Sequence, residues 1–336
     1  MAKHAADRAI TLAPESPEVH LALSYYYLWS LRDSEKAFKE LEIAEKGLPS
    51  NAEILKAKGY IFELHGRYEE ARNAYERAFE LSPRDASLPT ELIFVFWVTR
   101  KYPQAVEAAN QAIALAPDEA WPYLGKAFVY WSWKSATEEA HVALEAVPIE
   151  HSWAPWAWFW QVIFEGEYRE ALERLSSTSS EWIRLKAWAR PICLLEAFAY
   201  DFLGESQRAR SYYEKARILL EKEVEVWPND PRLHSSLGIA YAGLGRREAA
   251  IREGKRAVEL LPVTEDAFYG LPYLQDLAHI YTLLGEHETA LDQIEYLLTI
   301  PSWISIPWLQ KDPRFRGLRD HPSYQVLVEQ YSEHKE

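Results

Sequence analysis

Residues 52–85, AEILKAKGYIFELHGRYEEARNAYERAFELSPRD, decide the fold of this chain. Apolar and small residues recur at helical spacing in both halves of the stretch, and residues 65–67 (His-Gly-Arg) interrupt the pattern as a turn does. Gly59 in the first half and Ala71 in the second are small enough for two helices to approach closely. The stretch therefore predicts a helical hairpin that ends at Pro83.

Prolines repeat along the chain at nearly constant spacing. Pro14, Pro49, Pro83 and Pro117 are separated by 35, 34 and 34 residues, and Pro228 and Pro262 again by 34. A fixed period of this length is the signature of a solenoid, in which each hairpin packs on its neighbours. The period predicts repeat units that start near residues 18, 52, 86, 120, 152, 190, 231 and 271.

This repeat resembles the tetratricopeptide (TPR) family. The unit 52–85 has Gly59, Phe62, Ala71, Tyr75, Ala78 and Pro83 at the places where that family carries its small, aromatic and proline residues. The unit that begins at 231 has Leu237, Gly238, Tyr241, Ala250, Ala257 and Pro262. The resemblance implies an all-α, right-handed TPR superhelix: an α-solenoid of about eight helical hairpins, with an N-terminal half-repeat and a C-terminal capping helix.

The pattern divides the chain into three parts. Residues 1–16 match only the second helix of a truncated repeat, residues 17–301 form the TPR array, and residues 302–336 form a C-terminal cap. Hydroxyl side chains crowd residues 176–181, where they compete for backbone hydrogen bonds, so we expect a hinge there. Met1 is the only methionine, which favours an excised segment whose native protein continues upstream with a further domain.

Residues 262–328 carry a second resemblance, to the C-terminal ends of TPR arrays in bacterial multidomain regulators. Its motifs are Asp266-Ala267, the turn at 283–286 (Leu-Leu-Gly-Glu) and the run 301–305 (Pro-Ser-Trp-Ile-Ser). In such regulators the array follows an output domain, such as a winged helix, a nucleotide cyclase or a protein kinase. The resemblance implies that this chain is the sensory or interaction module of a larger bacterial regulator.

Composition excludes several classes of function. The 336 residues include 37 Lys and Arg against 51 Asp and Glu, so a net charge of -14 argues against nucleic acid and anionic membranes as partners. Cys193 is the single cysteine, so no intrachain disulfide can form. The first 30 residues lack the pattern of a signal peptide. These features predict a cytoplasmic protein.

Catalytic and metal-binding motifs are nearly absent from the sequence. Gly243 and Gly245 lie in a turn between two predicted helices and lack the third glycine of a dinucleotide-binding loop. A carboxylate and a histidine share one helical face at Glu138 and His141, and again at Asp276 and His279. The two pairs lie four units apart, whereas a di-iron site needs them to face one another. We therefore predict no cofactor, no metal site and no enzymatic activity.

The TPR resemblance also implies where a ligand would bind. In that family the first helix of each unit lines the concave face, chiefly through its positions 2, 5, 9 and 12. The candidate groove residues at those positions are Tyr26, Trp29, Glu53, Lys56, Tyr60, Glu63, Phe94, Trp97, Trp121, Phe128, Trp131, Trp153, Trp156, Trp160, Phe198 and Asp201. The chain has fourteen tryptophans, and those in this set form an aromatic stripe through the middle of the array.

Two interpretations of the aromatic stripe stay open at this point. Aromatic residues at helical spacing are typical of a packed core, and the register around Phe159 is irregular. Tryptophan and tyrosine also dominate binding hot spots because they give large, rigid contact surfaces with a polar tip. Residues such as Leu92 and Tyr123 already fill the ordinary packing positions, which favours a binding groove.

The sequence favours a noncatalytic scaffold that binds a peptide or protein partner in the aromatic groove. The basic clamp with which chaperone-binding TPR domains hold a terminal carboxylate is missing, because Tyr60 stands where an asparagine is needed beside Lys56. A small aromatic-stacking or cationic molecule, or an oligosaccharide, is the alternative ligand. An enzyme with an aromatic channel is the third hypothesis, with only Asp201, Glu63 and His279 as candidate catalytic groups.

Overall fold

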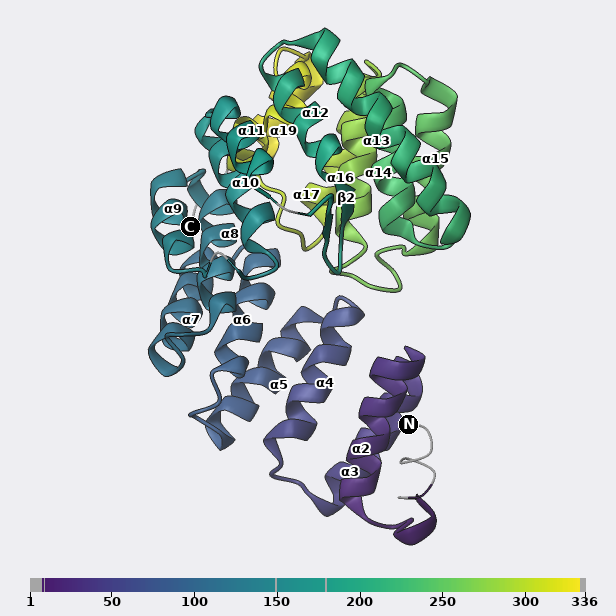
Figure 1. The fold of residues 1–336 in the computed structure, drawn as a ribbon. Coiled ribbons are helices and arrows are strands. Elements are labelled where there is room, and N and C mark those ends of the chain that lie inside the picture. The colour runs from purple at the N-terminus through teal and green to yellow at the C-terminus, as the bar shows by residue number, and fades with distance from the viewer. Residues whose placement is uncertain (1–7, 9, 149, 179, 333–336) are drawn as a thin grey trace. The chain divides into compact units, whose positions relative to one another are not determined.

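The computed structural model describes residue 8 and residues 10–148, 150–178 and 180–332 (Figure 1). The chain forms two compact units. The first unit comprises residues 1–96 and 103–119, and the second unit comprises residues 97–102 and 120–336. Residues 1–7 and 9 of the predicted half-repeat lie outside the described residues, as do residue 179 of the predicted hinge and residues 333–336 of the predicted cap.

Helices joined by short turns make up the first unit. In chain order they are α2 (Pro17–Tyr25), the π-helix η1 (Tyr26–Leu31), α3 (Ser34–Gly47), α4 (Ala52–Leu64), α5 (Tyr68–Leu81), most of α6 (Ser87–Val98) and most of α7 (Tyr102–Leu115). Side-chain caps mark where α3 and α4 begin. Asn51 Oδ1, for example, accepts hydrogen bonds from the backbone N–H groups of Glu53 (2.9 Å) and Ile54 (3.2 Å) at the start of α4.

The second unit begins with α8 (Ala120–Lys134), α9 (Thr137–Glu145), α10 (Ala154–Glu165), α11 (Tyr168–Ser176), β1 (Trp182–Arg184), β2 (Ala189–Pro191) and α12 (Ile192–Phe202). It continues with α13 (Ser206–Val226), α14 (Pro231–Gly243), α15 (Arg247–Leu260), α16 (Leu271–Leu283) and α17 (His287–Thr299). It closes with α18 (Ile306–Lys311), the 3-10 helix η2 (Pro313–Leu318) and α19 (Pro322–Ser332).

Within the described residues, seven pairs of consecutive helices pack closely as hairpins: α2 with α3, α4 with α5, α8 with α9, α10 with α11, α12 with α13, α14 with α15 and α16 with α17. Each predicted unit start falls within two residues of the first residue of α2, α4, α6, α8, α10, α12, α14 or α16. The predicted all-α repeat architecture is confirmed. Among the described helices, none combines the length and the apolar character that a bilayer crossing requires.

Small residues set the spacing between the paired helices of the α4–α5 and α14–α15 hairpins. A Cβ atom on Gly59 of α4 would lie 2.6 Å from the ring of Tyr75 of α5, so only glycine leaves room for that buried ring. In α14 a Cβ atom on Gly238 would lie 2.9 Å from the backbone nitrogen of Gly254 in α15. The small residues that define the repeat are therefore the points where paired helices touch.

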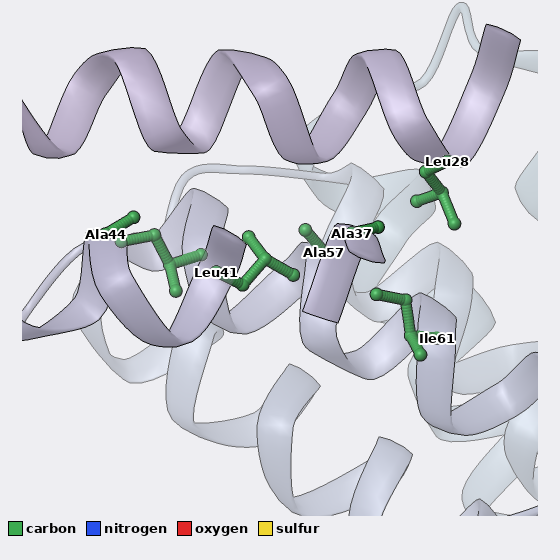
Figure 2. Packing of buried hydrophobic residues seen from close by; sticks show 7 residues of the cluster. Leu28, Ala37, Leu41, Ala44, Ala57 and Ile61 are labelled. Atoms are coloured by element: carbon green, nitrogen blue, oxygen red, sulfur yellow. The ribbon is translucent and has the colours of Figure 1, made fainter. Parts of the chain in front are cut away.

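A cluster of buried apolar side chains joins η1, α3 and α4 in the first unit (Figure 2). Its members are Leu28, Ala37, Leu41, Ala44, Ile54, Ala57 and Ile61. Four of them, shown in Figure 2, are alanines or leucines of α3 and α4 that face one another across the helix contact. Burial of each large side chain contributes about 1.5–3 kcal/mol relative to an exposed one.

A short β-hairpin, which the sequence pattern does not indicate, follows α11. Strands β1 and β2 pair antiparallel, with Ile183 opposite Arg190, and the N–H of Leu185 donates to the carbonyl of Trp188 (2.7 Å) to close the turn. Each strand has only three residues, too few for a period-2 pattern to stand out in the sequence. The side chain of Arg190, in β2, lies in the interior of the second unit; this residue is 1% exposed.

His234 of α14 bridges two acceptors inside the second unit. Its Nδ1 lies 2.7 Å from Glu253 Oε2 and its Nε2 lies 2.9 Å from the carbonyl oxygen of Pro228. Burial lowers the pKa of His234, but the hydrogen bonds to these two acceptors outweigh burial, so the pKa is raised above its ordinary 6.5. Because both partners are acceptors, the protonated imidazolium is the form that can donate from both nitrogens.

We expect this bridge to make the stability of the second unit depend on pH. Because the folded-state pKa of His234 is raised, its contribution is fully present below pH 6.5 and is lost as pH rises through the folded pKa. The free energy of unfolding from urea melts should therefore fall as the pH rises above about 6.5. In His234→Gln this fall should shrink, and an equal fall in the variant would contradict the assignment.

Candidate functional site

The candidate groove residues of the second unit are mostly buried. Trp97, Phe128, Trp131, Trp156, Trp160 and Phe198 are between 0% and 8% exposed. Their rings contact one another: Trp97 lies 5.7 Å from Phe128 between ring centroids, and Phe128 lies 5.2 Å from Trp131. These side chains belong to a packed aromatic interior, which accords with the core interpretation of the stripe.

Residues 302–318, which we call the C-terminal segment, cover these aromatics. The ring of Trp303 stacks on that of Trp97 at 5.5 Å, and the ring of Trp308 lies 5.2 Å from Phe164 and 6.3 Å from Trp131. Trp303 and Trp308 are themselves 4% and 6% exposed. The chain's own C-terminal segment thus takes the place on the first helices of the second unit where a ligand was expected.

Hydrogen bonds fix the C-terminal segment against the earlier part of the second unit. The Ser305 hydroxyl donates to the carbonyl of Ser132, and the Ser135 hydroxyl donates to the carbonyl of Pro307 (2.5 Å). The Arg100 guanidinium donates to the carbonyl of Ile304 (3.1 Å). Helix α18 packs on α8, η2 packs on α16, and α19 packs on α17. η2 and α19 therefore lie on the last hairpin, α16–α17, as a cap would, whereas α18 lies on α8.

Two buried ion pairs lie where the C-terminal segment meets the rest of the second unit: one beside the segment and one within it. Arg190 Nη2 donates to both carboxylate oxygens of Asp276 (2.7 and 2.6 Å), and the Ser235 hydroxyl donates to the same group. Arg314 pairs with Asp312 (2.6 Å), and its guanidinium lies 4.2 Å from the ring centroid of Trp160. Each buried charge is therefore matched by an opposite one.

The three candidate catalytic groups occupy different environments. His279 is 1% exposed, and burial together with the guanidinium groups of Arg314 and Arg190 holds its pKa well below the ordinary value. Burial raises the pKa of Asp201, whose carboxylate lies 3.6 Å from Arg316. Glu63 belongs to the first unit and accepts a hydrogen bond from Tyr75 (3.1 Å). Among the described residues, no group of three or more acidic, histidine or cysteine side chains could hold a metal ion.

Trp121 and Trp153 complete the candidate residues of the second unit. Both are half-buried, and their ring centroids are 5.0 Å apart in an edge-to-face arrangement. Trp153 also contacts Trp188 of the β-hairpin at 5.8 Å. These two tryptophans lie at the edge of the aromatic interior, where part of each ring remains at the surface.

Candidate residues of the first unit are more exposed. Trp29 in η1 is 57% exposed, and its ring centroid lies 4.7 Å from that of Tyr60 in α4. Tyr26, Lys56, Tyr60 and Phe94 are partly exposed, Glu53 is exposed and Glu63 is 9% exposed. We call Tyr26, Trp29, Glu53, Lys56, Tyr60 and Phe94 the first-unit surface.

Polar contacts order this surface. The Tyr25 hydroxyl donates to Glu53 (3.0 Å), and the Lys56 ammonium donates to Ser87 (2.5 Å) and lies 3.7 Å from Asp85. The π-helix η1 ends at Leu31, and the next residue, Arg32, has a left-handed backbone (φ 54°). Segments of π-helix widen a helical turn and often occur at functional sites.

The side chains that cover the aromatic stripe could not be identified from the sequence. Trp303, Trp308 and Arg314 come from a tail that was assigned to a cap, and Arg190 lies in the unforeseen β-hairpin. The tail did carry a signal: a run with two tryptophans, two isoleucines and a proline at 303–308 is more apolar than an exposed cap needs.

Residues 52–85 match the sequence model of the tetratricopeptide repeat family. The chain carries a tetratricopeptide repeat. The TPR array is similar in fold to the crystal structure of the APC/C hetero-tetramer Cut9–Hcn1, with 15% identity over 94% of this chain and 63% of that chain and a TM-score of 0.50. Another similar structure is a tetratricopeptide repeat protein from Parabacteroides merdae, with 13% identity over 90% of this chain and 97% of that chain and a TM-score of 0.40. No curated protein matches the sequence.

Proposed function

We propose that this TPR array binds a peptide segment of a partner protein on the first-unit surface. One observation carries the proposal. In the second unit the chain's own Trp303 and Trp308 cover the candidate groove residues Trp97 and Trp131. In the first unit the candidate groove residue Trp29 is 57% exposed. TPR proteins as a family generally bind peptides or proteins.

The side chains of the first-unit surface indicate which class of peptide would bind there. Trp29 and Tyr60 offer aromatic faces that suit apolar or proline-rich side chains. Glu53 is an exposed carboxylate, while the ammonium group of Lys56 is already held by Ser87 and Asp85. A peptide with an apolar or proline-rich core and a basic residue fits this surface best.

The experiment starts from peptides selected on the full chain from a random phage-displayed library. Trp29→Ala and Tyr60→Ala should each weaken the selected peptides about tenfold or more, because exposed aromatic anchors dominate such interfaces. Fluorescence polarisation of labelled peptides measures the dissociation constants. The melting temperature should change little in Trp29→Ala, since that side chain is largely exposed.

A matched control is Trp227→Ala, which removes a tryptophan that is 61% exposed at the end of α13 in the second unit. Peptide affinity should not change in this variant. Selected peptides that bind Trp29→Ala and Tyr60→Ala as tightly as the unaltered chain would refute the proposal.

The biological setting that we propose is the sensory or interaction module of a larger cytoplasmic regulator in a bacterium. The resemblance of residues 262–328 to the ends of regulator arrays supports it. We do not assign a small-molecule or oligosaccharide site to the second-unit tryptophans, because Trp131 and Trp160 are each 2% exposed. Catalysis is likewise not assigned: the TPR family is generally noncatalytic, and the His279 side chain is enclosed.

A further inference from the structure

A cleft of about 420 Å³ opens on the second unit, between the start of α13 and the turn that joins α14 to α15. Its lining residues are Gln207, Arg210, Ser211, Glu214, Leu244 and Arg246. Four of these carry polar groups on α13, and Arg246 is the N-cap of α15. The cleft lies among residues that play no part in the proposed peptide site.

At two other places in the second unit, the start of a second helix meets the second helix of the preceding hairpin. We call these places junctions, and an ion pair closes each of them. Glu205, the N-cap of α13, lies 3.6 Å from Arg169 of the preceding second helix, α11. Glu286, the N-cap of α17, pairs with Arg247 of α15. In both junctions a carboxylate at the helix start meets an arginine from the preceding hairpin.

The charge order is reversed at the cleft. Arg246 stands where the other junctions have a glutamate, and α13 presents a second arginine, Arg210, whose Nη1 lies 3.4 Å from the carbonyl oxygen of Leu244. Glu214 pairs closely with Arg217 (2.6 Å) and lies farther from Arg246 (3.7 Å). Arg246 therefore shares the Glu214 carboxylate with Arg217, which holds it more closely.

We propose that this cleft binds an anionic oxygen group, a carboxylate or a phosphate, between Arg210 and Arg246. Guanidinium groups recognise both anions through paired N–H donors, and the Ser211 hydroxyl and the Gln207 amide lie in the same cleft as further donors. The bound anion supplies the charge that Glu205 and Glu286 supply at the other junctions. Because the net charge of the chain is -14, attraction must come from contacts within the cleft.

Titration of the full chain with inorganic phosphate, with citrate and with a short acetylated Asp-Glu peptide tests the proposal. Arginine Nε–H resonances in NMR spectra report the binding. The resonances of Arg210 and Arg246 should shift with saturation, and comparison of the three probes tells whether phosphate or carboxylate is preferred. Shifts that grow linearly for all arginines would show nonspecific ionic association and overturn the proposal.

Variants sharpen the test because the relevant side chains lie at the surface. Arg246→Gln and Arg210→Gln should each weaken binding about tenfold, the usual effect of losing a charge-assisted contact. Glu214→Gln should strengthen it by removing the competing carboxylate. Arg256→Gln, a control on the same helix as Arg246 with an exposed guanidinium near Glu259, should leave it unchanged. Equal affinities in all four variants would refute the site, and none of these outcomes bears on the first-unit surface.

Discussion

Trp308→Ala should lower the free energy of unfolding by about 3–5 kcal/mol, the usual cost of removing a buried tryptophan. Trp308 is 6% exposed and packs its ring against Phe164 and Trp131, and its indole N–H donates to Asp312 (3.0 Å). Alanine would leave a cavity between α8, α10 and α18 and would remove a partner of a buried carboxylate.

Urea unfolding followed by far-UV circular dichroism measures this change without depending on tryptophan fluorescence. Trp227→Ala is the matched control because it removes the same side chain from an exposed position of the same unit, and it should cost less than about 0.5 kcal/mol. A loss in Trp308→Ala as small as in the control would mean that the C-terminal segment does not pack on the aromatic interior.

Arg190→Met should destabilise the chain by about 3–5 kcal/mol, because it leaves the Asp276 carboxylate buried without its charge partner. Both side chains are almost fully buried, with 2% and 3% exposure. Adding Asp276→Leu to Arg190→Met should recover much of the loss, since an apolar pair of similar volume often replaces a buried ion pair without cost.

The control for this pair lies on the other strand of the same hairpin. Arg184 of β1 bonds Glu223 (2.7 Å), but the two side chains are 42% and 31% exposed. Arg184→Gln should therefore cost less than about 1 kcal/mol in the same urea experiment. Similar losses in Arg190→Met and Arg184→Gln would contradict the assignment of Arg190 to a buried pair.

The hairpins could be predicted because their determinants are local. Gly59, Ala71 and Tyr75 meet within one 34-residue unit, and the same places recur along the chain. Prolines after most of the second helices, although not after α11, set the period. A motif of this kind contains both the helices and the contact between them, so the sequence alone places each hairpin.

The cover over the aromatic stripe could not be predicted because it depends on distant contacts. Ser135 and Pro307, which are bonded, lie 172 residues apart in the chain, and Arg100 and Ile304 lie 204 apart. The position of a residue in a helix predicts which face of the helix its side chain is on. It does not predict which other part of the chain packs against that face. The residues predicted as one groove consequently divide into a mostly buried set in the second unit, with Trp121 and Trp153 half-buried, and a more exposed set around Trp29 in the first unit.

The Arg190 ion pair escaped prediction for a related reason. Asp276 and His279 stood out in the sequence as a carboxylate–histidine pair on one helix face. In the structure the carboxylate is bonded by Arg190 from 86 residues away, and His279 packs its ring 5.4 Å from Phe198. A buried carboxylate looks the same in sequence whether its partner is an arginine or a metal ion.

Hydrogen–deuterium exchange of the full chain, with and without a selected peptide, tests the central claim most directly. Amides of Leu309 and Asp312, which bond the carbonyls of Ser305 and Trp308, should be protected in both states, because the C-terminal segment is built into the second unit. Added peptide should slow exchange in η1 and α4 around Trp29 and Tyr60. Rapid exchange across residues 302–318 in the free chain, or peptide protection confined to α8 and α10, would contradict the account.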